Sequence, residues 1–200
     1  MSREIVIATR NADKGREIAA ILDGIGVCVR TLAEFPDAPE VIEDGTTCEA
    51  NAMKKAMSAA RHTGLVAVAD DTGLIVDVLG GRPGVYAARY AGEYATYEDN
   101  WRKLLQELSG VPKALRTARF ITVAAIARPD REKIEIVEGV LDGLIAEAPA
   151  GERGFGYDPV FFVPELKRTL AQLSSEEKNR LSHRARAFAK VREILSQGDF

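Results

Sequence analysis

The sequence has few cysteines, no long apolar run and no excess of basic residues. Its 200 residues include two cysteines, Cys28 and Cys48, and neither lies in a C-x-x-C pattern. A disulfide framework and a thiolate metal site are therefore not indicated. The longest apolar stretch, around Phe120 to Ala127, is far shorter than a membrane span, and the N-terminus lacks a signal-peptide pattern. We expect a cytoplasmic protein without a membrane partner.

The charge balance also narrows the range of partners. The formal net charge is -3 at pH 7, so the chain as a whole does not attract phosphate polymers, and nucleic acid is not an expected partner. A local basic patch could still bind a single nucleotide. With 46% hydrophobic and 28% charged residues, the chain can bury a sizeable core. We expect a single domain over residues 1–200.

Hydrophobic periodicity predicts an alternation of strands and helices. Strands are expected at apolar, β-rich runs, which are Ile5 to Ala8, Val27 to Thr31, Leu65 to Ala69, Thr117 to Ala127, Ile134 to Ile145 and Phe161 to Val163. Helices are expected around Ile18 to Ile25, from a Thr46-x-x-Glu49 capping box to Thr63, over Tyr97 to Leu108, and after a Ser174-x-x-Glu177 capping box. Loops are expected at Phe35 to Pro39 and Gly80 to Gly84. The pattern favours an α/β fold with a mixed sheet covered by helices.

A polar segment, Thr9-Arg10-Asn11-Ala12-Asp13-Lys14, lies where the first strand gives way to the first helix. Free N–H groups and the helix dipole favour phosphate at such a place, and Lys14 would add a positive charge. The segment has no glycines before the lysine and is not a Walker loop. The alternative is that Asn11 or Asp13 caps the helix and Lys14 is solvated.

Asp70 and Asp71 directly follow an apolar run, where two acids need solvent, a metal or hydrogen-bond donors. Adjacent strand residues point to opposite faces, so we expect one acid, Asp71, to be the direct metal ligand. Glu43, just before the helix that is expected to end at Thr63, could supply a second oxygen for Mg²⁺ shared with a triphosphate. A loop with solvated acids is the alternative.

Two segments near the C-terminus could bind a base and phosphates. Gly151 to Pro159 combines three glycines with Phe155 and Tyr157, which could stack on a planar base, and Asp158 could accept from its N–H groups. A glycine-rich turn with buried aromatics is the alternative. Positive charge then gathers at residues 178–186, either as a counter-surface for substrate or as a solvated helix face. If both Lys178 and Arg184 touch ligand, the helix should break near Ser182.

Together, these segments resemble the inosine/xanthosine triphosphate pyrophosphatase family. The motifs that match in order, over almost the whole chain, are Thr9-x-Asn11-x-x-Lys14, Glu43-x-Gly45-x-Thr47, Asn51-Ala52-x-x-Lys55-Ala56, Ala69-Asp70-Asp71-Thr72-Gly73-Leu74, Pro83-Gly84-Val85-Tyr86-x-Ala88-Arg89-Tyr90, Gly154-Phe155-Gly156-Tyr157-Asp158-Pro159 and Ser182-His183-Arg184. Each motif is modest, but seven motifs in the same order are highly specific. The stretch Cys48-Glu49-Ala50 departs from the family pattern, which usually has Phe and then Glu before the Asn-Ala pair.

The resemblance implies a homodimer with a long curved mixed sheet and two lobes around a nucleotide cleft. It implies hydrolysis of ITP, dITP and XTP between the α- and β-phosphates with Mg²⁺. Asp71 would accept the proton and bind metal, with Glu43 and Asp70 assisting. The residues implied in substrate binding are Thr9, Arg10, Asn11, Ala12, Asp13, Lys14, Lys55 and Thr72 for phosphates, and Phe155, Gly156, Tyr157, Asp158, Lys178, His183 and Arg184 for base and sugar.

Two other functions are compatible with the same residues. One is a related pyrophosphatase that acts on modified pyrimidine nucleotides with the same metal chemistry. The other is a nucleotide-binding regulatory module that senses a nucleotide without hydrolysing it, against which the acids beside a phosphate loop argue. A substrate panel separates the first, and an assay for pyrophosphate release separates the second.

Overall fold

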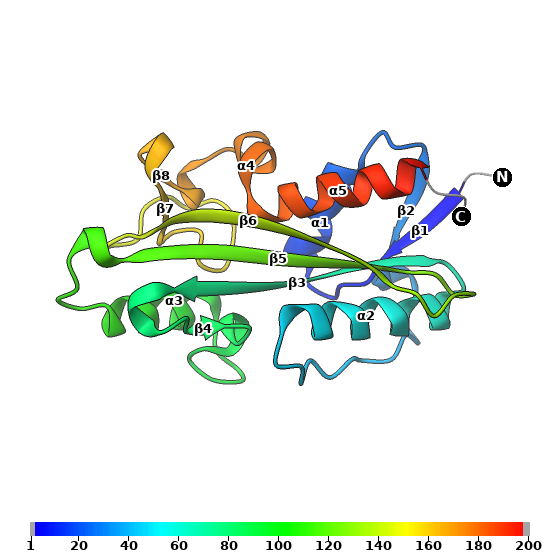
Figure 1. The fold of residues 1–200 in the computed structure, drawn as a ribbon, viewed down its shortest axis with the longest axis horizontal. Coiled ribbons are helices and arrows are strands. Elements are labelled where there is room, and N and C mark those ends of the chain that lie inside the picture. Colours follow the sequence, from blue (N-terminus) through cyan, green and yellow to red (C-terminus); the bar gives the residue numbers. More distant parts are fainter. Residues whose placement is uncertain (1–2, 198–200) are drawn as a thin grey trace. The chain divides into compact units, whose positions relative to one another are not determined.

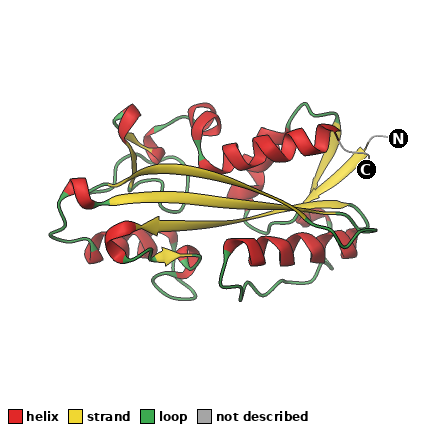
Figure 2. Cartoon of the chain, in the orientation of Figure 1, coloured by secondary structure: helices red, strands yellow, loops and turns green. Residues whose placement is uncertain are grey.

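The computed structural model describes residues 3–197, which form an α/β fold (Figures 1 and 2). The strands are β1 (Arg3–Ile7), β2 (Val27–Thr31), β3 (Val66–Val76), β4 (Pro83–Gly84), β5 (Thr117–Ala127), β6 (Glu135–Ile145), β7 (Phe161–Val163) and β8 (Arg168–Thr169). The α-helices are α1 (Ala12–Leu22), α2 (Cys48–Thr63), α3 (Tyr97–Glu107), α4 (Ser175–Leu181) and α5 (His183–Gln197). Short 3₁₀ turns connect several of these elements.

The strands form one mixed sheet in the order β2-β1-β3-β5-β6-β7-β8, and β4 pairs with β3. β1 is parallel to both of its neighbours, with Ile5 opposite Val29 of β2 and Val66 of β3. The pairs β3–β4, β6–β7 and β7–β8 are antiparallel. The predicted α/β class with a mixed sheet is confirmed.

The chain divides into two compact units, each built from separate stretches of sequence. Unit 1 comprises residues 3–71, 122–139 and 183–197, and unit 2 comprises residues 72–121 and 140–182. Each unit has its own apolar core. The core of unit 1 includes Ile5, Ile18, Val68, Ile126, Phe188 and Val191. The core of unit 2 includes Leu74, Leu104, Phe120, Ile145, Phe161 and Leu170.

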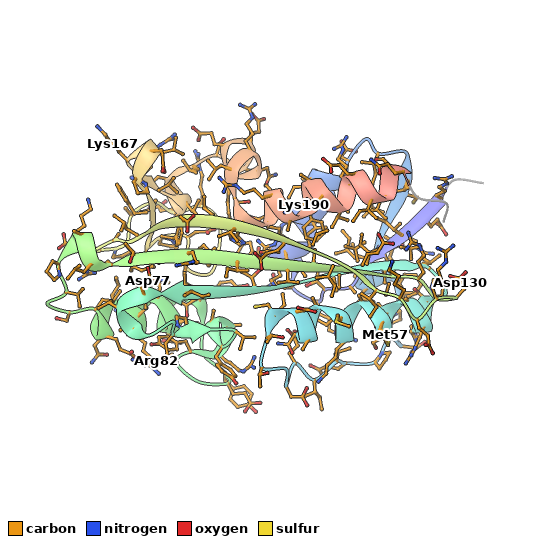
Figure 3. All side chains as sticks on the ribbon, in the orientation of Figure 1. Met57, Asp77, Arg82, Asp130, Lys167 and Lys190 are labelled. Carbon is orange, nitrogen blue, oxygen red and sulfur yellow. The ribbon has the colours of Figure 1, made fainter. Side chains whose placement is uncertain are left out.

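Helices cover both faces of the strands in unit 1. α1 and α5 lie together on one face, and α2 lies on the other (Figure 1). Met57 on α2 and Lys190 on α5 mark these two layers in Figure 3, and Lys190 Nζ donates to the carbonyl of Glu138 at 2.7 Å. The start of α5 comes so close to β6 that a methyl group at Gly139 would lie 2.1 Å from the carbonyl oxygen of His183. Only glycine permits this approach.

Polar side chains that bind backbone groups support unit 2. The Arg116 guanidinium is buried and donates to the carbonyls of Leu108, Val111 and Ala146 at 2.8 to 3.0 Å. Asn100 on α3 accepts from Ala91 N and donates to the carbonyl of Ala88. Buried polar groups with such partners fix the loops around α3 without an unsatisfied hydrogen bond.

Three predictions about elements are wrong. The strand that was expected to end at Ala69 continues through Asp70 and Asp71 as β3, because cations neutralise the acids and the apolar pattern resumes at Leu74. Thr47 rather than Thr46 caps α2, and its side chain accepts from Ala50 N, so Glu49 does not close a capping box. The Gly80–Gly84 loop contains the short strand β4, and β8 was not predicted.

The helix breaks at Ser182, as expected if Lys178 and Arg184 both touch ligand, and that ligand contact stays a prediction. Ser174 caps α4 through a capping box with Glu177, α4 ends at Leu181, and α5 begins at His183. Ser182 has extended backbone angles between the two helices. Among residues 3–197, no helix has the length and apolar character needed to cross a membrane.

Candidate active site

Asp70 and Asp71 are adjacent in β3, and their side chains turn to opposite faces of the strand. Lys14 Nζ of α1 lies 3.3 Å from Asp70 Oδ2, whereas Asn51 Nδ2 of α2 lies 3.2 Å from Asp71 Oδ2. Because α1 and α2 cover opposite faces of these strands (Figure 1), the two contacts follow the alternation of a β-strand. The prediction that the two acids face different sides is confirmed.

Two cations neutralise Asp70, which is 2% exposed. Arg184 Nε lies 3.2 Å from Asp70 Oδ2, which Lys14 also approaches, and Arg184 Nη1 donates to Glu17 at 2.7 Å. Burial opposes ionisation, but the charges of Lys14 and Arg184 outweigh it and hold the pKa of Asp70 below its usual range. Asp70 is therefore ionised at neutral pH and joins β3 to α1 and α5.

Asp71 lies in a different electrostatic environment. Lys55 Nζ lies 3.6 Å from Asp71 Oδ1 and also donates to Glu43 Oε2 at 2.8 Å. Burial raises the pKa of Asp71 against the opposing charges of Lys55 and Lys14, and the Glu43 carboxylate adds to the rise. A carboxylate with a raised pKa is a better proton acceptor than an ordinary one. Of the two acids, Asp71 is thus the one suited to take a proton from a nucleophile.

The donors around Asp71 fit a hard cation shared with a substrate. Among the residues that the structure describes, no three His, Cys, Asp or Glu side chains gather as a ligand set. Mg²⁺ commonly takes only one or two protein carboxylates, together with waters and substrate phosphates. Glu43 and Asp71, which both contact Lys55, supply two such groups. These two carboxylates could therefore form part of a site for a hard cation if substrate phosphates and water supplied the remaining ligands.

The Thr9 to Lys14 segment is ordered by its own side chains. Asn11 caps α1, and its Oδ1 accepts from the N–H groups of Asp13 and Lys14 at 3.0 and 3.1 Å. Thr9 Oγ1 accepts from Asn11 N at 3.2 Å, and Arg10 Nη2 donates to the carbonyl of Ala38 at 2.6 Å. Ala12 is the first residue of α1. The Asn11 cap of the alternative interpretation is present, but Lys14 is paired with Asp70 rather than solvated, and phosphate binding here stays a prediction.

His183 and Arg184 begin α5, and both side chains are buried. His183 Nδ1 lies 2.6 Å from the hydroxyl of Thr122 on β5, so the ring is fixed from one side. Arg184 is held by Asp70 and Glu17. The structure therefore places Arg184 beside the Asp70 carboxylate of β3 and His183 against β5, and contact of either residue with a base stays a prediction.

A second group of predicted residues belongs to unit 2. Lys178 Nζ lies 2.5 Å from Asp158 Oδ2 and 4.7 Å from the centre of the Phe155 ring. Phe155 N donates to the same Asp158 oxygen at 2.9 Å. Gly154 has φ +74°, and a methyl group there would lie 2.0 Å from Asp158 Oδ2. The glycine-rich turn thus wraps closely around a buried ion pair.

The two aromatic residues of this turn have different surroundings. Tyr157 is buried, its hydroxyl donates to the carbonyl of Ala87 at 2.8 Å, and burial raises its pKa. Phe155 is half-buried, and its ring lies 5.8 Å from that of Tyr97. Gly156 between them has φ +63°. Phe155 is therefore the better candidate for stacking on a base, and Tyr157 supports the turn from the core.

Sequence reasoning missed several partners of these residues. Asn51, Glu17 and Thr122 contact Asp71, Arg184 and His183, respectively. Asn51 lies in a motif that was recognised, but its amide had no assigned role. Thr122 lies inside an apolar strand, and no local pattern distinguishes it from a structural threonine.

Residues 5–194 match the Ham1 family. The chain is 55% identical over 191 residues to a dITP/XTP pyrophosphatase of Geobacillus kaustophilus (strain HTA426), covering 96% of this chain and 93% of the relative. It is 47% identical to the dITP/XTP pyrophosphatase of Bacillus subtilis (strain 168), covering 96% and 97%.

Solved structures show the same fold. A HAM1 protein from Coxiella burnetii has a TM-score of 0.88 at 38% identity, covering 98% of this chain and 100% of that one. The Ham1 protein of Staphylococcus aureus has a TM-score of 0.85 at 40% identity, covering 96% and 98%. The predicted family resemblance is confirmed, and this chain belongs to the Ham1 family.

Proposed function

We propose that this protein is a nucleoside triphosphate pyrophosphatase that hydrolyses non-standard purine nucleotides such as ITP, dITP and XTP to the monophosphate and pyrophosphate. The observation that carries the proposal is the Asp71 carboxylate, buried, raised in pKa and adjacent to Lys55. The names of close relatives, dITP/XTP pyrophosphatases at about half identity over nearly the whole chain, support the substrate class.

Asp71 acts as the proton acceptor. The oxygen of a water molecule attacks the α-phosphorus, its proton passes to Asp71, and the bond from the α-phosphorus to the bridging oxygen breaks. The electron pair of that bond leaves with pyrophosphate. The environment of Asp71 favours this role, because burial makes its neutral form easier to reach than that of a solvated carboxylate.

The cations of unit 1 serve the leaving group. Lys55 lies between Asp71 and Glu43, and Lys14 is held at Asp70, so both ammonium groups are fixed near the acids. Fixed positive charge that is already in place stabilises the charge that develops on pyrophosphate. Glu43 and Asp71 would hold Mg²⁺, which supplies charge neutralisation at the phosphates when bound. Asp70 as a third direct ligand stays a prediction, because its Oδ2 binds Lys14 and Arg184.

The remaining substrate contacts are assigned by the same proposal. Phosphates are bound by Thr9, Arg10, Asn11, Ala12, Asp13, Lys14, Lys55 and Thr72. Base and sugar are bound by Phe155, Gly156, Tyr157, Asp158, Lys178, His183 and Arg184. The 6-oxo group of hypoxanthine or xanthine accepts a hydrogen bond where adenine offers a donor, and a mismatched buried donor loses on the order of a few kcal/mol. Homodimeric assembly and a cytoplasmic location belong to the same proposal.

The test is the identity of the products. The purified chain is given ITP, dITP, XTP, ATP, GTP and a modified pyrimidine triphosphate with Mg²⁺, and products are separated by chromatography. We expect IMP and pyrophosphate from ITP, with much slower hydrolysis of ATP. In ¹⁸O-labelled water, the label should enter IMP and not pyrophosphate. Accumulation of IDP, label in pyrophosphate, or equal rates on ATP and ITP would contradict the proposal.

A further inference from the structure

Asn51 is a buried amide that uses both ends of its side chain. It lies on α2, is 1% exposed and has partners from two other segments of unit 1. Its Oδ1 accepts from Gly45 N at 2.8 Å, and its Nδ2 donates to Asp71 Oδ2 at 3.2 Å. A buried amide with a partner at each end is fixed in one orientation.

The orientation of the amide follows from the chemistry of its partners. The backbone N–H of Gly45 can only donate, so it requires the Asn51 oxygen. An ionised Asp71 carboxylate can only accept, so it requires the Asn51 nitrogen. A flipped amide would place two donors together at one end and two acceptors at the other. The backbone of residue 45 therefore determines which group Asn51 presents to Asp71.

Asn51 and Lys55 hold the two oxygens of the same carboxylate. They are four residues apart on α2, so they lie on one face of the helix. Asn51 binds Asp71 Oδ2, and Lys55 approaches Asp71 Oδ1 while also binding Glu43. Glu43 and Gly45 belong to the same short segment before α2. The helix face thus fixes the rotation of the Asp71 side chain and the segment that carries Glu43.

We propose that Asn51 is a positioning residue for hydrolysis, which holds Asp71 in the rotation needed for proton transfer. The inference rests on the proposed function, because it assigns to Asn51 an effect on a step performed by Asp71. Replacing a residue that acts through another group should lower turnover more than substrate affinity. The same replacement should have little further effect in a variant in which the other group has already been removed.

The first measurement separates turnover from affinity. Asn51→Asp keeps the acceptor for Gly45 N but puts an oxygen against Asp71, and Asn51→Leu removes both hydrogen bonds. We expect both variants to lower kcat on ITP by at least about tenfold, with KM changed by less than about threefold. The matched control is Asn100→Leu, because Asn100 is also 1% exposed on a helix but binds backbone groups of unit 2. A normal kcat in folded Asn51→Asp would overturn the inference.

The second measurement is a double-mutant cycle with Asp71→Asn. If Asn51 acts through Asp71, Asn51→Leu should lower kcat further by less than about twofold in that background. If instead the reductions in kcat caused by Asn51→Leu and Asp71→Asn multiply in the double variant, Asn51 has a separate, structural role and the inference is overturned. Asn100→Leu should have the same relative effect on kcat in both backgrounds.

An exchange variant keeps the test usable where Asn51→Leu does not fold. Asn51→Asp combined with Asp71→Asn restores one carboxylate and one amide at the contact, with the Gly45 acceptor retained. Its melting temperature should exceed that of Asn51→Asp alone, whereas its turnover should stay as low as that of Asp71→Asn. A melting temperature that is not raised would show that the contact does not exist and would overturn the inference. The proposed function fails separately, and the inference with it, if the unchanged chain releases no pyrophosphate.

Discussion

A methyl group at Gly45 would lie 2.5 Å from Asn51 Oδ1 and 3.0 Å from the Ala50 side chain. The first distance is shorter than any normal contact, so residue 45 is glycine for reasons of space. Its backbone is not in the left-handed region, and conformational freedom is not the cause. The close approach is what brings Gly45 N within 2.8 Å of the Asn51 amide.

Gly45→Ala should therefore shift the Asp71 carboxylate through Asn51, although the new methyl group does not contact Asp71. The added methyl group would displace Asn51 from Asp71, and we expect kcat on ITP to fall by at least about tenfold in a folded protein. Steady-state kinetics measures the change. Gly15→Ala is the control, because a methyl group there would meet no atom closer than 3.7 Å. Equal kcat values for the two variants would show that Asn51 need not be held in place.

Asp71→Asn keeps the size of the side chain but removes the charge that accepts a proton and binds metal. We expect turnover to fall by at least about a hundredfold with the fold intact. Pyrophosphate release and circular dichroism measure the two properties. Asp77→Asn is a control, since Asp77 (labelled in Figure 3) lies on the surface of unit 2 and binds Thr117 and Arg119. Near-normal turnover in folded Asp71→Asn would refute the assignment.

Chelation should abolish activity. Glu43 and Asp71 offer oxygen ligands only, and the described residues contain no cluster of histidines or cysteines that would retain a soft metal. We expect EDTA to stop pyrophosphate release from ITP and excess Mg²⁺ to restore it. Full activity after exhaustive chelation would rule out the proposed role of the metal.

The stability of the protein should depend on pH through Asp70. Its pKa is lowered on folding from 3.8, so its contribution to the free energy of unfolding is present above pH 3.8 and is lost as the pH falls through the folded value. At pH 7, Asp70→Asn leaves Lys14 and Arg184 without their shared anion, and we expect a loss of about 3–5 kcal/mol. The difference between the two proteins in urea unfolding should shrink from pH 5 to pH 2. A constant or growing difference would contradict this.

Gly154→Ala should affect substrate binding more than turnover. The methyl group would meet Asp158 Oδ2 at 2.0 Å in a backbone conformation with φ +74°, so the Asp158–Lys178 pair must move. If these residues bind the base, KM for ITP should rise by at least about tenfold, with a smaller change in kcat. Gly110→Ala also introduces a side chain at positive φ, but with open space around it, and serves as the control for strain. An unchanged KM would show that the turn around Gly154 does not bind the substrate.

The elements that the sequence predicts best are those whose pattern is local. β2, β5 and β7 have the predicted bounds, and a helix break is present at Ser182, where it was expected on the condition that Lys178 and Arg184 both touch ligand. The end of β3 was wrong because two acids in a row indicate solvent when only neighbours in sequence are considered. One of the two cations that neutralise Asp70 inside the strand, Arg184, comes from 114 residues away. β4 and β8 have two residues each, too few for a periodic pattern.

The candidate site shows the same division. Asp71 and Glu43 were expected as metal ligands and Lys55 as a phosphate-binding residue, and the structure places Lys55 in contact with both carboxylates. The role of Asn51 could not be predicted from the sequence, because it depends on which end of the side-chain amide meets the backbone N–H of Gly45. A single sequence contains the residue type but not the orientation of its side chain.

The pairing of Asp70 with Arg184 has a consequence for synthesis on the ribosome. Unit 1 begins with the first strand of the chain, but its buried carboxylate receives the second cation only from α5, close to the C-terminus. Until α5 leaves the ribosomal tunnel, Asp70 lacks that partner and the face of β1 and β3 under Phe188 and Val191 lacks its cover. The N-terminal strands are thus synthesised first, but they gain the packing and the second cation of α5 last. A chain without the later turns of α5 would contain every residue proposed for metal binding but would lack Val191 and Leu195 from the core of unit 1.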